Sequence, residues 1–106
     1  MNKKFIVSTF SPKMFIEQDF DLKWHRLSEE EFHALIFDAY SCVGYEDVAT
    51  MLNVAYNPES VKARVGDILL LADLNKGKLE YWCIQICPSE SPLIRTEEID
   101  YIDEMI

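Results

Sequence analysis

The sequence predicts an α+β fold, with a mainly antiparallel or mixed sheet of about five strands and two helices packed on it. Three observations support this prediction. The chain has 106 residues, which is the length of a single domain. Hydrophobic residues make up 49% of it, enough to exclude a disordered chain. Apolar runs and alternating stretches, both typical of strands, stand before and after two stretches with helical spacing.

Two strands are predicted at the start of the chain. Residues 4–10 are rich in Phe, Ile, Val and Thr, and their unbroken apolar centre predicts a strand that is buried on both faces. Residues 19–27 alternate, with Phe20, Leu22 and Trp24 on one face and polar side chains on the other. We expect this second strand to have one face in water.

Two helices are predicted in the middle of the chain. Ser28 and Glu31 have the spacing of a capping box, so the first helix begins there. Residues 40–43 are expected to form a short strand that ends at Gly44, and a second helix is expected over about residues 45–53. The side chains expected to point inward are Phe32, Leu35, Ile36 and Ala39 from the first helix, and Val48, Met51 and Leu52 from the second.

The second half of the chain predicts three more extended stretches. Residues 60–65 alternate, with Val, Ala and Val on one face. Residues 68–74 are the most apolar run and predict a central strand. Residues 79–87 return as the antiparallel partner after a hairpin loop that contains Gly77.

The end of the chain differs in character from the rest. After Pro88 it carries six acidic residues and one arginine, which is more than half of the net charge of −9. We therefore divide the chain into a domain of residues 1–88 and an acidic extension of residues 89–106, for which a helix capped by Thr96 is expected. Two readings of this extension stay open: a solvated helix that closes one edge of the sheet, or a surface for a partner.

Charge and composition exclude several classes of protein. A net charge of −9 disfavours binding to double-stranded DNA, to RNA or to anionic membrane surfaces, which all attract positive proteins. The start of the chain lacks the apolar segment of about 7–15 residues found in signal peptides. No run reaches the roughly 18–20 apolar residues of a membrane span. Three sparse cysteines do not suit a disulfide framework, so we expect a reduced, cytoplasmic protein.

No metal site and no cofactor are predicted. Cys83 and Cys87 lie four residues apart in an expected strand, which separates them by about 13 Å, too far for one zinc ion. They are expected to be buried thiols. His25 and His33 are not accompanied by a Cys or Ser in a nucleophile motif, so we expect structural roles for both.

Five short stretches of the sequence are specific when their order and spacing are taken together. They are Ser8-Thr9-Phe10-Ser11-Pro12-Lys13-Met14, Leu27-Ser28-Glu29-Glu30-Glu31-Phe32, Ser41-Cys42-Val43-Gly44-Tyr45-Glu46-Asp47-Val48-Ala49, Val61-Lys62 followed by Gly66-Asp67-Ile68-Leu69-Leu70, and Leu79-Glu80-Tyr81-Trp82-Cys83-Ile84. In this order the chain resembles the viral ring nuclease family, the type III anti-CRISPR proteins of archaeal viruses, phages and integrative elements. The resemblance covers about residues 4–87 and leaves out the acidic extension.

The resemblance implies a dimer that encloses a cyclic oligoadenylate and cleaves it without a metal. A histidine of the family assists the attack of a ribose 2′-hydroxyl, and Tyr45 stands at the matching position here. A phenol has a pKa of about 10 and an imidazolium a pKa of about 6.5, so tyrosine is a poor proton shuttle at neutral pH. Pro58 stands where the family commonly has a phosphate-contacting Arg, whereas Ser11, a ligand-contact position, matches. The resemblance therefore implies a divergent member that lacks the catalytic histidine.

Five residues are predicted to form a binding site. Ser11 follows from the resemblance, and a helix N-terminus at Gly44 and Tyr45 would point amides at a bound phosphate. The Tyr45 ring can also stack on a base. Lys62 and Arg64 share one strand face and could offset the acidic charge, although a solvated face is the commoner role of such a pair.

Three functions remain in competition. The first is a non-catalytic protein of a mobile element that binds a cyclic or signalling nucleotide at a homodimer interface. The second is an acidic interaction module that inhibits a basic, nucleic-acid-binding protein of the host. The third is an active, metal-independent ring nuclease that uses Tyr45 or a histidine elsewhere in the chain.

Overall fold

The computed structural model describes residues 2–17 and 19–89. The helix expected after Thr96 lies outside the described residues. In order, the elements are β1 (Lys4–Val7), η1 (Pro12–Met14), β2 (Phe20–Leu27), α1 (Glu29–Leu35), η2 (Ile36–Asp38), β3 (Tyr40–Ser41), α2 (Glu46–Leu52), β4 (Ile68–Asn75) and β5 (Lys78–Pro88).

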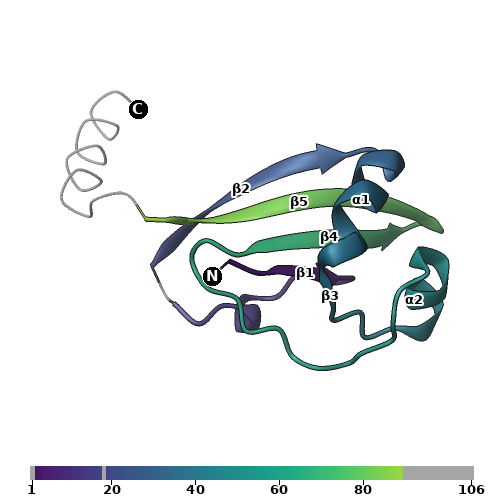
Figure 1. Ribbon diagram of the computed structural model, residues 1–106, viewed down its shortest axis with the longest axis horizontal. Coiled ribbons are helices and arrows are strands. Elements are labelled where there is room, and N and C mark those ends of the chain that lie inside the picture. The colour runs from purple at the N-terminus through teal and green to yellow at the C-terminus, as the bar shows by residue number, and fades with distance from the viewer. Residues whose placement is uncertain (1, 18, 90–106) are drawn as a thin grey trace.

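The strands form one mixed sheet in the order β2-β5-β4-β1-β3. β1 runs parallel to both of its neighbours, β3 and β4, whereas β5 is antiparallel to β4 and β2. Figure 1 shows α1 lying across the sheet over β5 and β4, with α2 beside the same end of the molecule. The predicted α+β class, with a mixed sheet of five strands and two helices, is confirmed.

The sheet separates two apolar cores, because neighbouring residues of a strand point to opposite faces. The core on the helix-bearing face consists of Ile6, Phe32, Ile36, Val43, Val48, Ala49, Leu52, Leu70 and Ala72. The core on the second face consists of Phe5, Val7, Val61, Ala63, Leu69, Leu71, Ile84 and Ile86. Both α-helices of the described residues pack on the first core, whereas η1 and the irregular segment before β4 pack on the second.

The apolar centre of β1 is buried on both faces, as expected for a strand between two others. Phe5, Ile6 and Val7 are at most 9% exposed. The strand ends at Val7 rather than at residue 10, because its pairing with β4 stops there and the chain bends at Ser8 and Thr9. This early end is a correction to the sequence prediction, and it frees the next residues to form a loop.

The predicted capping box is present at the start of α1. The Ser28 hydroxyl accepts a hydrogen bond from the Glu31 backbone N–H at 3.1 Å, and the Glu31 carboxylate accepts one from the Ser28 N–H at 2.8 Å. The hairpin between β4 and β5 also forms as expected. Lys76 and Gly77 have φ values of 53° and 81°, the pair of positive values that a type I′ turn requires.

Three other expectations are wrong. Residues 60–65 alternate in burial but form no strand, since Ala63 makes only an isolated bridge to Phe15. Met51 is 51% exposed because the buried side of α2 is centred on Val48, Ala49 and Leu52, about 100° around the helix from Met51. Trp24 shares a face with Leu22 as predicted, yet it is 43% exposed because the covering segment does not extend over it.

Candidate functional site

A cavity of about 390 Å³ lies at the carboxyl end of β1. In sheets with parallel strands, ligands commonly bind beyond the carboxyl ends of the strands, where neighbouring connections diverge and leave a crevice. β1 is the one described strand with a parallel partner on each side, so the crevice forms at its end. The lining residues are Ser8, Thr9, Ser11, Lys13, Met14, Cys42, Gly44, Tyr45, Pro58, Glu59, Ser60 and Val61.

One wall of the cavity comes from the chain that leaves β1. Ser8 is only 8% exposed, because it still follows the buried strand. Ser11 then caps η1, and its hydroxyl accepts a hydrogen bond from the Lys13 backbone N–H at 3.3 Å. Pro12 favours this turn because its ring presets φ at the first helical position. The turn thereby places Lys13 in the lining of the cavity.

The opposite wall comes from the chain that leaves β3. Cys42 is held to β1 by a hydrogen bond from its N–H to the Ile6 carbonyl at 2.8 Å. Gly44 and Tyr45 follow, and Tyr45 is the residue before α2, with extended backbone and no side-chain capping bond. The Tyr45 ring is 56% exposed, so it is free to contact a ligand.

The first turn of α2 differs from the expected phosphate-binding end of a helix. This helix has only seven residues and carries Glu46 and Asp47 in its first turn. The Asp47 carboxylate accepts the N–H of Val48 at 2.9 Å. Carboxylates already occupy the positive end of the helix, so the positive charge of the cavity has to come from a side chain.

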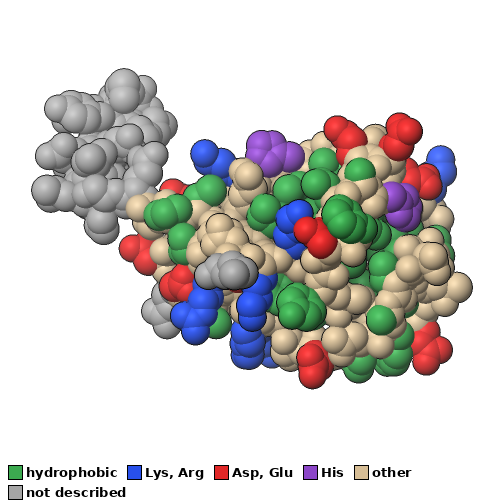
Figure 2. Space-filling view, in the orientation of Figure 1, with side chains coloured by type: hydrophobic (Ala, Val, Ile, Leu, Met, Phe, Trp, Pro, Cys, Tyr) green, Lys and Arg blue, Asp and Glu red, His purple; other side chains and the backbone are tan. Residues whose placement is uncertain are grey.

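Lys13 is the cation that the sequence prediction missed. Among the described residues that line the cavity, it is the only one with a positive charge, and Glu59 is the only one with a negative charge. The available signal was the Ser11-Pro12 pair, which starts a tight turn and so returns the following side chain to the end of β1. Figure 2 shows the helix-bearing face, where Lys and Arg side chains gather near the start of β1 and acidic ones lie both around the helices and at the opposite end of the sheet.

Cys42 lines the cavity as a neutral thiol. Burial raises the pKa of this thiol, and the nearby negative charge of Glu59 raises the pKa further. Only the thiolate is an effective nucleophile, so Cys42 is poorly suited to attack a substrate at neutral pH.

The predicted site residues separate into two groups. Ser11, Gly44 and Tyr45 line the cavity together, although they come from two distant parts of the chain. Lys62 is exposed and lines a neighbouring depression that shares Glu59 and other residues with the cavity. Arg64 is exposed and lines neither; its backbone N–H donates to the Asp67 carboxylate at 2.9 Å.

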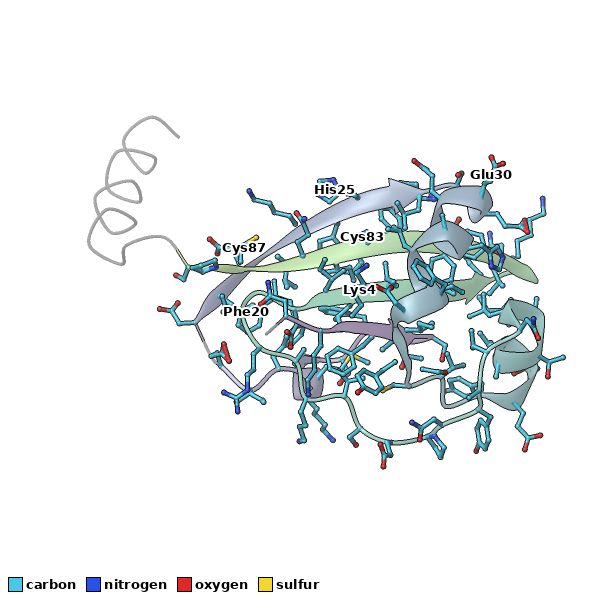
Figure 3. All side chains as sticks on the ribbon, in the orientation of Figure 1. Lys4, Phe20, His25, Glu30, Cys83 and Cys87 are labelled. Atoms are coloured by element: carbon cyan, nitrogen blue, oxygen red, sulfur yellow. The ribbon has the colours of Figure 1, made fainter. Side chains whose placement is uncertain are left out.

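Neither histidine lines the cavity. His33 lies on α1 beside Tyr81, with ring centroids 6.4 Å apart. His25 is exposed on the edge strand β2, opposite Cys83 of β5 (Figure 3). The described part of the chain has no group of three or more His, Cys, Asp or Glu residues placed to hold a metal ion. Cys42, Cys83 and Cys87 are free thiols and are partly buried rather than fully buried.

No helix among the described residues is long and apolar enough to span a membrane.

No protein-family model matches the sequence, and no curated protein matches it. The fold is similar to that of B116 of Sulfolobus turreted icosahedral virus, with a TM-score of 0.73 and 17% identity. The match covers 79% of this chain and 99% of that protein. At this identity the likeness concerns the fold, which therefore also occurs in a viral protein.

Proposed function

We propose that this chain is an accessory protein of a virus or mobile element that binds a cyclic or signalling nucleotide without cleaving it. The cavity at the carboxyl end of β1 carries the proposal. Its lining residues include three that carry hydroxyls, Ser8, Thr9 and Ser11, and one that carries an ammonium group, Lys13. Hydroxyls donate hydrogen bonds to phosphate oxygens, and lysine supplies a compact positive charge. The resemblance to viral ring nucleases makes cyclic oligoadenylate the first ligand to test, and the viral B116 fold agrees with this setting.

The size of the cavity favours a ligand shared between two copies of the chain. Pockets for small molecules commonly have volumes of about 300–1,000 Å³, and this cavity, at about 390 Å³, is near the lower limit. A ring of several nucleotides is larger than the single nucleotide that such a volume suits. We therefore propose a homodimer in which each copy holds part of the ring.

Binding without cleavage follows from the groups that surround the cavity. Cleavage by a ribose 2′-hydroxyl needs a group that accepts a proton near neutral pH. Tyr45 supplies a phenol there, Cys42 supplies a thiol with a raised pKa, and neither histidine lines the cavity. The described lining thus offers donors that hold a phosphate and no imidazole beside it, with Glu59 as its one carboxylate.

A binding experiment with matched lysine variants tests the proposal. Calorimetry with cyclic tetra-adenylate should show saturable binding to the full chain. Lys13→Ala should weaken the affinity by roughly 10- to 100-fold, because a hydrogen bond to a charged group is worth about 1.5–3 kcal/mol. Lys62→Ala, a matched control outside the cavity, should weaken it by less than about threefold. No heat at high micromolar concentrations would rule out this ligand and the proposal with it.

The same samples decide between binding and catalysis. Incubation of cyclic tetra-adenylate with the full chain in EDTA, followed by chromatography, should recover the ring intact. Rapid cleavage in EDTA would instead establish an active ring nuclease, the third function that the sequence left open.

A second candidate, an acidic module that inhibits a basic host protein, is favoured by carboxylates close to the cavity. Asp47 and Asp73 line a depression that shares Ser8, Thr9 and Tyr45 with it, and the full chain has a net charge of −9. To test this second candidate, capture of purified basic proteins is compared between the full chain and a full-length variant. In the variant, the six Asp and Glu residues after Pro88 are changed to Asn and Gln. Equal capture by both would remove the extension from this function.

A further inference from the structure

The second face of the sheet carries a continuous row of aromatic rings. Successive ring centroids are 4.6, 5.6, 5.1 and 5.8 Å apart along the series Phe20, Phe15, Phe10, Trp24 and Trp82. The guanidinium of Arg26 lies 5.1 Å from the Trp82 ring centroid and continues the row. These distances are within the range of favourable aromatic contacts. We call these six residues the aromatic row.

The aromatic row is buried at one end and open at the other. Phe15 and Phe20 pack against the second core, and Figure 3 shows Phe20 at the start of β2, at the opposite end of the sheet from Glu30 in α1. Phe10 is 37% exposed, Trp24 is 43% exposed, and the Arg26 side chain is 56% exposed. Core packing explains the buried end but leaves the exposed rings of Phe10 and Trp24 without a structural role.

The open end of the row is connected to the cavity lining through the chain at Phe10. Phe10 lies between Thr9 and Ser11 in the sequence, and both of these neighbours line the cavity. The Phe10 ring itself contacts Trp24. Phe10 itself does not line the cavity, so a ligand with its phosphate beside Ser11 and Lys13 would have to extend its sugar and base past Ser11 to contact the row.

We propose that the open end of the aromatic row stacks the bases of the nucleotide whose phosphate lies in the cavity. This proposal rests on the proposed function and names the part of the ligand that the cavity does not hold. Stacking suits the site because each base has a π face and each exposed ring offers another. The row therefore serves as the base-binding part of the same site.

The charges near the row favour a base over a phosphate. The Glu80 carboxylate lies 3.7 Å from the Arg26 guanidinium and offsets its positive charge. This pairing reduces the attraction of Arg26 for a phosphate, whereas stacking of a neutral base needs no charge. We therefore expect the phosphate beside Lys13 in the cavity and the base on the rings of Trp24 and Trp82.

Tryptophan fluorescence tests the proposal directly. The chain has two tryptophans, and both belong to the aromatic row, so their emission reports on this surface. Cyclic tetra-adenylate should quench the emission with the same dissociation constant that calorimetry gives. Inorganic tripolyphosphate, which has no base, should leave the emission unchanged.

A set of ring variants measures the contribution of stacking. Trp24→Leu should weaken binding of cyclic tetra-adenylate by roughly 5- to 150-fold, the range expected for one stacked base. Trp24→Phe keeps a ring and should retain most of the affinity, which separates stacking from a change in folding. Phe37→Leu is the matched control, since Phe37 is 85% exposed in η2 and lies outside the row; it should bind as the unaltered chain does.

The outcomes separate this inference from the proposed function. Absence of any calorimetric binding would overturn the proposed function. Calorimetric binding with unchanged emission and equal affinity in Trp24→Leu would overturn only the stacking role. If Trp24→Leu instead changed the sedimentation of the ligand-free chain and left the affinity unchanged, the row would be a contact between two copies, and the stacking role would also be wrong. Should Trp24→Leu fail to fold, the affinity of Trp24→Phe and the quenching experiment decide.

Discussion

The capping box at the start of α1 allows one stability prediction to be worked out in detail. Ser28→Ala removes the hydroxyl that accepts the Glu31 N–H at 3.1 Å, while the bond from the residue 28 N–H to the Glu31 carboxylate stays available. Loss of such a cap costs about 1 kcal/mol. For a domain of this size, that loss lowers the melting temperature by roughly 4–8 °C.

The loss should affect the whole domain rather than one turn. α1 has seven residues, far fewer than the about 12–15 that an isolated helix needs to be stable in water. It forms because Phe32, 0% exposed, packs into the core and against the Tyr81 ring at 4.8 Å. A frayed first turn weakens the placement of Phe32, so the cap and the core are coupled.

The same cap should make part of the stability depend on pH. Hydrogen bonds from Ser28, first from its backbone and then from its side chain, lower the pKa of Glu31, and burial opposes them weakly. A carboxylate with a lowered pKa in the folded state contributes stability above its unfolded pKa, about 4.3, and loses it as pH falls through the folded pKa. Ser28→Ala removes only the side-chain cause of the lowered pKa, so its destabilisation should be slightly smaller at pH 3 than at pH 7.

Urea unfolding followed by circular dichroism at pH 7 and pH 3 measures both effects. Glu30→Gln is the matched control, because Glu30 lies in the same first turn but makes no described capping bond. It should change the free energy of unfolding by only about 0.3–1 kcal/mol, through the helix dipole. A loss in Ser28→Ala below about 0.5 kcal/mol at pH 7, or one that is the same at both pH values, would refute the reasoning.

Two other substitutions have definite expected results. Asp67 is 6% exposed, and its two carboxylate oxygens accept the backbone N–H groups of Lys3 and Arg64, each at 2.9 Å. Asp67→Asn turns an NH₂ toward one of these donors and should lower the free energy of unfolding by about 1–3 kcal/mol. A loss below about 0.5 kcal/mol, measured by urea unfolding, would contradict this. Tyr45→His should leave stability within about 0.5 kcal/mol, because Tyr45 is exposed and makes no capping bond. If Tyr45 does stand at the position of the family's histidine, this variant should cleave cyclic tetra-adenylate in EDTA roughly 10²- to 10⁴-fold faster than the unaltered chain, and binding without cleavage by the variant would show that the positions do not correspond.

Local features of the fold were predictable because their causes lie within a few residues. The capping box depends on Ser28 and Glu31, and the β4–β5 hairpin depends on a turn that accepts positive φ at Lys76 and Gly77. The unbroken apolar run of β1 likewise predicts burial on both faces without knowledge of its neighbours. In each case the chemistry of adjacent residues selects one conformation.

The candidate site was predictable in part. The resemblance placed Ser11, Gly44 and Tyr45 together, and the cavity contains all three. It did not indicate Lys13, whose approach depends on the turn that Ser11 and Pro12 form beyond β1. Lys62 and Arg64 were placed correctly on a solvent-facing side, but their alternation could not reveal how far that side lies from the end of β1.

The sequence by itself determined the class of fold, the local starts and turns of its elements, and which residues share a face. Only the tertiary structure decided which parts of those faces are covered. Trp24 and Leu22 have the same orientation, yet the segment over the second core leaves Trp24 open. The physical reason is that side-chain alternation follows from backbone geometry within one strand, whereas burial depends on chain segments that are distant in the sequence.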